Sequence, residues 1–556
     1  MRASWAGWSA PEGSGTKSSR AAASAPPASC TALLFAFVAT ALPAQERADS
    51  VLGPSIHRIE LHRQDVYDVA EATSWLPRLA NSLHVKTRPY VIEREFLFMP
   101  GQPFDPVLVA ETGRNLRSLG LFREVRIDSV RTDSGLAVRV VTQDGWTTRP
   151  GVRFRSVGGD VVIGLEFVED NFLGTATELG VGYVRDPDRT TLNVNFRQPR
   201  LIRRKVGLAL RYEDRSDGQV VAGVLEQPFF SLAGAFSFRL AGESRDETVY
   251  QYRNGSSDAV DSLTRRYAVV RGAMTWAVSR PPEGYLRAGV AGQIRREDYL
   301  PAELEGGPSK TVTGTVGPFA EVSWVRFEET EGFVTFSRTE DIRLSTTFRL
   351  GAFVAPKAWG YERTGIGPAV GLRTGAVFRG GFLILDAIAQ GLYTSAGLDS
   401  GSAVLSGTLA WRSDSNSLLT LHADGGWLKD PAPGQEFDIG LRNGPRAFGI
   451  HSFTGDQAFF TTAEYRRLVL PRVAGLFAVG LAGFVDYGGA WWRDEPRRTG
   501  TDAGVGLRLG FVRSPIGGLA RIDLAWRFAN DAKPAGLVLA IGKGFTFSLS
   551  ATSSRR

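Results

Sequence analysis

The residue types that carry out chemistry are sparse in this chain, and their spacing fits no common catalytic or metal-binding site. The five histidines are His57, His62, His84, His422 and His451. None of them is spaced as metal ligands are, and there is no G-x-S-x-G nucleophile elbow or phosphate-binding loop. Ser452 follows one histidine, but neighbours in sequence do not make a catalytic triad. We therefore expect no enzyme activity, no metal and no cofactor.

Charged residues inside alternating stretches are better candidates for a site. In one stretch near the C-terminus every second side chain is apolar, and the opposite face holds Phe484, Asp486 and Gly488. The same alternation puts Glu464 and Arg466 on the polar face of their stretch. If the apolar faces meet lipid, these charges point into an interior where a lone carboxylate is costly and needs a cation. The alternative is that they only line a wet lumen, as in porins.

The elements that must position these residues are strands. From Thr148 to Ser550 period-two alternation replaces helical periodicity, most clearly in R-I-D-L-A-W-R-F (521–528). Alternation alone would also suit a soluble antiparallel sandwich. Tight connections (199–205, 470–473) alternate with long polar ones (254–264, 300–310, 429–454), and aromatic residues lie near strand ends. Short turns on one side and long loops on the other indicate a transmembrane antiparallel β-barrel, with up to twenty strands, or sixteen or eighteen if doubtful hairpins merge.

The first 44 residues have the pattern of a secretory signal peptide. Fourteen uncharged residues, 31–44, are too few to cross a bilayer, which takes about 20, but suit the apolar core of such a signal. Cleavage is expected after Ala41 or Ala44, and a buried helix is the alternative. Cys30, the single cysteine, lies inside this segment, so the exported chain would suit an oxidising compartment.

Residues 45–147 predict a small α+β domain, followed by the barrel (148–550) and a short tail (551–556). Asp105 and Pro106 suit the start of a helix, and alternating strands at 122–130 and 136–143 flank a turn. The whole chain is 43% hydrophobic and contains 64 glycines, which excludes disorder and suits tightly packed strands. Its 65 basic and 58 acidic residues are scattered, so nucleic-acid binding is not expected.

On these features the chain resembles the BamA/TamA outer-membrane assembly family, whose members are also described as bacterial surface antigens. M-P-G-Q-P-F-D (99–105) and N-L-R-S-L-G-L-F-R-E-V-R-I (115–127) resemble the second half of a POTRA domain. The matching positions are Gly101, Phe104, Leu116, Gly120, Phe122 and Val125. D-N-F-L-G-T (170–175) resembles a turn between the family's early strands. The resemblance implies sixteen barrel strands and a periplasmic POTRA domain.

The family resemblance also implies a contact inside the lumen. F-V-D-Y-G (484–488) matches the family's F-x-D-x-G strand, whose Asp pairs with the Arg of a V-R-G-F tetrad on a loop that folds inward. P-R-A-F (445–448) keeps Arg446 and Phe448 but replaces the other two residues, and Ala447 lacks the backbone freedom of glycine. The expected pair is Arg446 with Asp486; Arg442 is the alternative. A-E-Y-R-R-L (463–468) resembles the family's E-x-R strand.

The last strand resembles the C-terminal signal by which barrels are recognised for insertion. Gly542, Phe545 and Phe547 carry this likeness, although the chain runs on to Arg556. The resemblance implies a protein of the cell outer membrane that inserts or translocates client polypeptides. Its expected partners are outer-membrane lipid, unfolded clients, and periplasmic chaperones or accessory lipoproteins. Two alternatives are a translocator dedicated to one secreted partner and a porin-like barrel without client activity.

Overall fold

The computed structural model describes most of the chain after the predicted signal peptide. The described residues are 53–67, 75–133, 135–157, 160–201, 205–232, 234–253, 255–256, 259–281, 283–300, 311–336, 339–440, 443–512, 519–530 and 533–544. The signal peptide, Arg442, Phe545, Phe547 and the tail therefore lie outside the described residues. Among the helices of the described part, none is long and apolar enough to cross a membrane.

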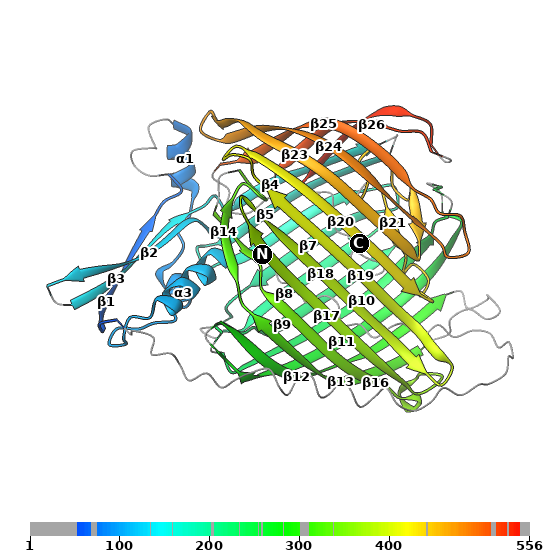
Figure 1. The fold of residues 1–556 in the computed structure, drawn as a ribbon, viewed down its shortest axis with the longest axis horizontal. Coiled ribbons are helices and arrows are strands. Elements are labelled where there is room, and N and C mark those ends of the chain that lie inside the picture. The colour runs from blue at the N-terminus through cyan, green and yellow to red at the C-terminus, as the bar shows by residue number, and fades with distance from the viewer. Residues whose placement is uncertain are drawn as a thin grey trace.

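In the part of the chain that the structure describes, twenty antiparallel strands close into one barrel (Figure 1), in which β27 returns to lie beside β4. Twenty is the upper value that the alternation allows, and it exceeds the sixteen implied by the resemblance. The strands are β4 (Thr148–Val157), β5 (Asp160–Phe172), β6 (Thr177–Arg185), β7 (Thr190–Gln198), β8 (Gly207–Arg215), β9 (Gly218–Gln227), β10 (Phe236–Gln251), β11 (Asp261–Ser279), β12 (Gly284–Leu300), β13 (Thr311–Trp324), β16 (Thr346–Ala355), β17 (Gly365–Phe378), β18 (Gly381–Thr394), β19 (Gly397–Trp411), β20 (Ser417–Lys429), β23 (Gln457–Val473), β24 (Phe477–Trp491), β25 (Gly500–Phe511), β26 (Ala520–Arg527) and β27 (Gly536–Lys543).

Side chains alternate between the two faces of the barrel wall. On β26, Leu524 and Trp526 are 44% and 48% exposed, whereas the alternate residues Asp523 and Ala525 are fully buried. β24 repeats the pattern, with Val485 outward and Asp486 inward. Large apolar residues thus cover the outside and charged residues the inside, which is the arrangement of a transmembrane barrel. The predicted fold class is confirmed.

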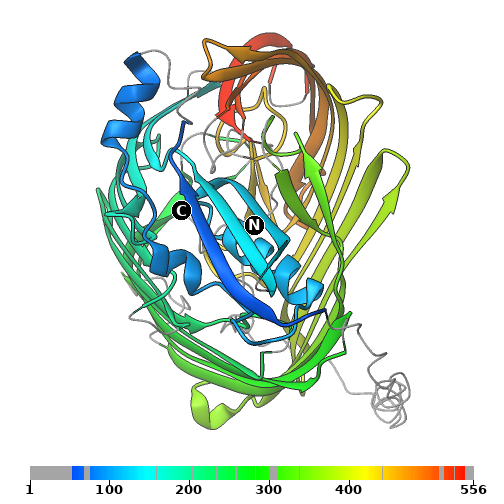
Figure 2. The same ribbon diagram turned by 90° about the vertical axis from the view of Figure 1, so that its left-hand side faces the viewer.

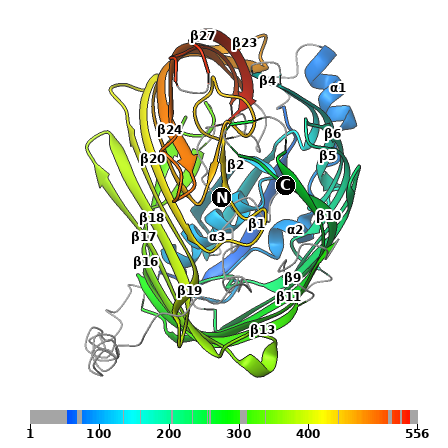
Figure 3. The same ribbon diagram turned by 90° about the vertical axis from the view of Figure 1, so that its right-hand side faces the viewer.

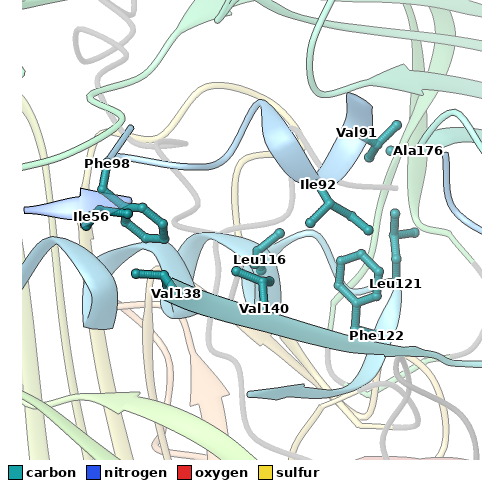
Figure 4. Packing of buried hydrophobic residues seen from close by; sticks show 10 residues of the cluster. All are labelled: Ile56, Val91, Ile92, Phe98, Leu116, Leu121, Phe122, Val138, Val140 and Ala176. Atoms are coloured by element: carbon teal, nitrogen blue, oxygen red, sulfur yellow. The ribbon is translucent and has the colours of Figure 1, made fainter. Parts of the chain in front are cut away.

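The N-terminal residues form a small α+β domain. Its elements are β1 (Ile56–Gln64), α1 (Trp75–Leu83), α2 (Pro89–Glu93), α3 (Pro106–Ser118), β2 (Phe122–Thr132) and β3 (Gly135–Asp144). The sheet has the order β1-β3-β2, with β1 parallel and β2 antiparallel to β3. Asp105 caps α3, since its carboxylate accepts the amide hydrogens of Val107 and Leu108, as its sequence position predicts. Apolar residues of the sheet, α2 and α3 form the core (Figure 4).

The domain lies across one end of the barrel, which we call the domain end (Figure 2); the opposite end is the far end (Figure 3). The connection between β13 and β16, residues 325–345, corrects the prediction of short turns on this side. It forms a hairpin of β14 (Phe327–Glu331) and β15 (Thr339–Arg343) beside α3. Its Phe333 and Leu344 pack against inward residues of the barrel such as Phe382. Apolar residues at these positions give the hairpin a buried face, so this connection folds inward.

At the far end the longest connection, residues 430–456, also folds inward, and we call it the inward loop. It contains the short pair β21 (Phe437–Ile439) and β22 (Phe453–Gly455). Phe437 and Phe453 pack on the inner surface of β20, β23 and β24. A single 3-10 turn, η1 (Lys357–Trp359), follows β16 at the same end. At the domain end of the barrel β23 runs as far as Val473. The tight turn predicted at 470–473 therefore follows Val473 instead.

Candidate functional site

The charged side chains of four neighbouring strands converge inside the barrel. Glu464 on β23, Asp486 on β24, Asp502 on β25 and Asp523 on β26 all point inward and are at most 4% exposed. Asp486 and Asp502 are direct cross-strand partners. Four buried carboxylates this close need cations, because an unpaired buried charge costs several kcal/mol.

Arg446 of the inward loop brings one of these cations. Its Nη1 lies 2.7 Å from Glu464 Oε2, and its Nε lies 3.0 Å from Asp486 Oδ2. Neither of these two nitrogens has the alignment of a hydrogen bond, whereas Nη2 of the same side chain donates to Asp486 Oδ1 at 3.5 Å. The guanidinium also covers the ring of Phe484 at 3.8 Å. The structure thus brings together the residues that the resemblance paired, while Arg442 lies outside the described residues.

Backbone amides of the loop strengthen the same contact. The amide of Arg446 donates to Asp486 Oδ2 at 3.3 Å, and the next amide, of Ala447, donates to Asp502 Oδ2 at 2.8 Å. Thr462 donates its hydroxyl to Asp486 Oδ1 at 2.6 Å. Ala447 is fully buried and is not among the described residues with positive φ, so alanine fits this position without strain.

Glu464 is the centre of the network. Beside Arg446 it receives Arg466, its neighbour on the same strand, and Arg508 Nη2 of β25 at 2.7 Å. Arg508 Nη1 also pairs with Asp523 at 2.6 Å. The sequence predicted Glu464, Arg446 and Arg466 as site residues. It did not single out Arg508, Asp523 or Asp502. Their signal was present, because period-two alternation places each of them on the inward face of its strand.

Aromatic packing fixes the loop next to the charges. Phe448 is fully buried, and its ring lies where a Cβ at position 500 would be, so Gly500 of β25 makes room for it. Arg527 donates to the carbonyl of Ala447 at 3.1 Å. The cluster around this point joins the loop to strands near the closure of the barrel; its members are Val162, Ala447, Ile450, Phe484, Ala525, Val538 and Ala540. The loop therefore supports the wall on both sides of the β27–β4 junction.

Gly488 and Gly542, two further predicted residues, also sit at close approaches. Gly488 faces the backbone of Phe460 on β23. A Cβ on Gly542 would lie 2.7 Å from Nε of Arg521, so this glycine leaves space for an inward cation. Phe545 and Phe547, its partners in the C-terminal pattern, lie outside the described residues.

A second contact holds the loop at the far end. His451 is 1% exposed; its Nδ1 lies 2.9 Å from Asp438 and its Nε2 lies 3.0 Å from Asp188, in the β6–β7 connection. Its ring stacks on Tyr252 at 3.4 Å, and the hydroxyl of Tyr252 also donates to Asp188. This histidine therefore holds the loop on the barrel wall. Ser452, its neighbour in sequence, makes a contact within the loop and donates its hydroxyl to the carbonyl of Gly449.

The residues predicted from the POTRA resemblance lie in and around the core of the N-terminal domain. Leu116 and Phe122 are buried in it, and Phe104 and Val125 pack against it. Gly101 and Gly120 occupy the turns before and after α3. The D-N-F-L-G-T motif forms the β5–β6 turn and inserts Ala176 into the same core beside α2 (Figure 4). These residues build the domain and its junction with the barrel.

Four connections at the domain end bind the N-terminal domain. Two contacts come from the β5–β6 and β7–β8 connections: the Arg88 amide donates to the Gly174 carbonyl at 2.9 Å, and buried Glu95 holds Arg200 through two bonds of 2.8 Å. The β9–β10 connection offers the amide of Leu232 to Glu111 of α3 at 2.7 Å. Burial raises the pKa of the Glu111 carboxyl above its ordinary value.

The fourth connection is the hairpin of β14 and β15. Arg117 of α3 binds Asp341 through two nitrogens at 2.8 and 2.9 Å, and also binds Glu329 at 2.9 Å. On its inner side the hairpin carbonyl of Phe333 accepts from Arg466 Nη1 at 3.1 Å. The hairpin thus connects the N-terminal domain to the charged network.

The network contains acids and arginines but no nucleophile held by a base. Within the described ranges, no group of three His, Cys, Asp or Glu residues could hold a metal ion. What these side chains can do is hold a loop and a hairpin inside a barrel.

Comparison with known proteins gives distant structural likenesses only. No family model matches the chain, and no curated protein matches its sequence. One similar solved structure is BamA from Haemophilus ducreyi lacking POTRA domains 1–3, at 12% identity and a TM-score of 0.38, covering 88% of this chain and 84% of that chain. CdiB from Escherichia coli is 12% identical, with a TM-score of 0.45 and coverages of 88% and 76%. CdiB from Acinetobacter baumannii is 11% identical, with a TM-score of 0.42 and coverages of 88% and 73%. The fold described above rests on this chain's own strand pairing.

Proposed function

We propose that the protein is an outer-membrane barrel that inserts or translocates client polypeptides, with its POTRA-like domain in the periplasm. The observation that carries this proposal is the placement of that domain across the barrel opening, bound by four connections. A pore for small solutes has no need of such a domain, whereas a protein that receives extended chains needs a binding element at the entrance.

The sheet of the domain offers the binding element. In the described part of the chain β3 is the only strand that pairs with β1 or β2, although residues 101–103 pair with the start of β1 at Ile56. β2 and the rest of β1 therefore each leave a row of backbone groups on the outer edge. An extended client segment adds to such an edge through main-chain hydrogen bonds, which are independent of its sequence. Burial of client strands in lipid then supplies the free energy, and we propose that no nucleotide, metal or enzymatic step takes part.

A dedicated translocator for one secreted partner is the second candidate. The observation that favours it is that two segments fold into the lumen from opposite ends, the inward loop and the β14–β15 hairpin. These segments would keep the lumen closed until the secreted partner displaces both of them, which is what a translocation pore needs. Periplasmic chaperones or accessory lipoproteins are proposed partners in either case.

Depletion of the protein followed by quantitative proteomics of the outer membrane and the medium separates these functions. Broad loss of barrel proteins from the outer membrane is the expected result for an insertion factor. Loss of one secreted protein, with the other barrels unchanged, assigns the translocator function. An unchanged outer membrane and medium contradict both candidates and favour a porin-like barrel.

A further inference from the structure

Helix α1 of the N-terminal domain presents an unusual exposed face. Trp75, Leu79 and Leu83 follow one another at intervals of four residues, so they lie on one side of the helix. They are 73%, 45% and 67% exposed. A tryptophan and two leucines on one face of a helix are normally buried, because exposing apolar surface to water is unfavourable.

The other side of α1 is fixed to the domain. Asn81 accepts the amide hydrogen of Tyr67 at 3.0 Å and donates to the carbonyl of the same residue at 2.8 Å. Just after the helix, His84 and Thr87 both contact the buried carboxylate of Asp144. The helix is therefore held in one orientation, with its apolar face away from the domain.

The position of α1 relative to the barrel identifies what covers this face. α3 lies across the barrel opening, but α1 lies at its perimeter beside β5 and β6, in both end views (Figures 2 and 3). The chain after α1 binds the β5–β6 turn: the amide of Arg88 donates to Gly174, and its Nε donates to the carbonyl of Leu173 at 3.0 Å.

Exposed apolar residues connect the helix to the outer surface of the barrel. Val85 follows α1 and is exposed, and so are Phe172 and Leu173 of the bound turn. Leu165 and Phe167 continue this surface along the outside of β5. Exposed apolar side chains thus occur on α1, on the turn that the segment after α1 binds, and on the outside of β5.

The charges of this segment fit a lipid headgroup surface. Residues 75–92 contain Arg78, Lys86 and Arg88 and no aspartate or glutamate, and of these cations Lys86 pairs with Asp65 at 2.8 Å. Basic residues beside an apolar face that carries tryptophan are typical of helices that lie in the plane of a membrane interface.

We propose that α1 is an interfacial helix whose Trp75, Leu79 and Leu83 insert into the lipid leaflet at the domain end of the barrel. The helix would then hold the N-terminal domain at the membrane surface as well as on the barrel. This inference rests on the membrane barrel and not on the proposed client function, so it stands or falls separately.

Site-specific labelling in vesicles tests this inference. The full chain with Cys30→Ser and Leu79→Cys is labelled with bimane and reconstituted in phosphatidylethanolamine–phosphatidylglycerol vesicles that contain a nitroxide lipid. Asp133→Cys, at the exposed tip of the β2–β3 hairpin, is the aqueous control, and Val181→Cys, outward on β6, is the lipid control. Heat-modifiable gel mobility shows that each barrel is folded.

The label at position 79 should behave like the label at position 181: quenched by the nitroxide lipid and protected from iodide in the buffer. Adding Trp75→Ser and Leu83→Ser to the Leu79→Cys chain should abolish lipid quenching and restore iodide quenching. Iodide quenching at position 79 equal to that at position 133 overturns the proposal. Protection from iodide without lipid quenching also overturns it, because a second copy of the chain would then cover the face. Unchanged lipid quenching after the two serine substitutions contradicts the role of the apolar face.

Discussion

Asp486 of β24 and Asp502 of β25 are cross-strand partners inside the barrel, and each accepts one of two consecutive amide hydrogens of the inward loop. Two carboxylates side by side repel each other in a low-dielectric interior. The cation of Arg446, 3.0 Å from Asp486, relieves that repulsion. The loop therefore supplies two hydrogen-bond donors and a cation to two adjacent carboxylates of the wall.

The first prediction concerns this contact. Arg446→Ala should destabilise the loop by about 3–5 kcal/mol, because it leaves Asp486 buried without its cation. Asp486→Ala should cost less, because Arg446 keeps Glu464 at 2.7 Å. The double variant should cost less than the sum of the two single variants, by a coupling energy of about 1–3 kcal/mol. Hydrogen exchange of residues 430–456, and the temperature at which the barrel loses its gel mobility, measure both effects. The contact would be assigned to Arg442 if two results came together. The stability losses of the two single variants would add in the double variant, and Arg442→Ala would cost as much stability as Arg446→Ala.

A second prediction concerns the packing of Phe448 on β25. Gly500→Ala places a methyl group where the Phe448 ring lies, and overpacking of this kind costs about 1–3 kcal/mol. Phe448→Ala makes room, so Gly500→Ala should cost much less in that background. Gly483→Ala on β24 is the matched control, since nothing lies within 4 Å of the added carbon. Equal losses from Gly500→Ala with and without Phe448 would show that the ring does not occupy this position.

The third prediction is a pH dependence of domain docking. Burial raises the pKa of Glu111, so the docked state binds more protons at this residue than the undocked state. Docking should be strongest below the ordinary glutamate pKa of about 4.5 and should weaken as the pH rises through the raised pKa. Glu111→Gln keeps an oxygen for the amide of Leu232 without the charge, and should strengthen docking at neutral pH.

Spin labels at positions 133 and 181 measure the undocked fraction as a function of pH. The exposed Glu93→Gln is the control and should leave the profile of the parent chain unchanged. If Glu111→Gln and the parent chain undock identically from pH 4 to pH 8, the charge of this carboxylate does not control docking of the domain.

Period-two alternation, together with connections that alternate in length, predicted the barrel and its inward and outward faces, because lipid and lumen impose opposite chemistries on alternate residues. The helix-start residues Asp105 and Pro106 and two alternating strands predicted the α+β domain. The Arg446–Asp486 contact required a family resemblance, since alternation shows that Asp486 faces inward but not what it meets. The inward fold of residues 325–345 was missed. Its buried face depends on Phe333 and Leu344 meeting Phe382 across the lumen, which is a tertiary contact without a local signal.

The central claim is that the N-terminal domain receives clients, and its deletion tests this most directly. Deleting residues 53–145 removes the domain but no strand of the barrel, so the shortened chain should still insert and keep its heat-modifiable mobility. The measurement is whether this barrel restores the outer-membrane and secreted proteins lost on depletion of the full chain. The account predicts an inserted barrel that restores none of them, because the strand-accepting edges of β1 and β2 are gone. Full restoration by the inserted, domainless barrel would contradict the account.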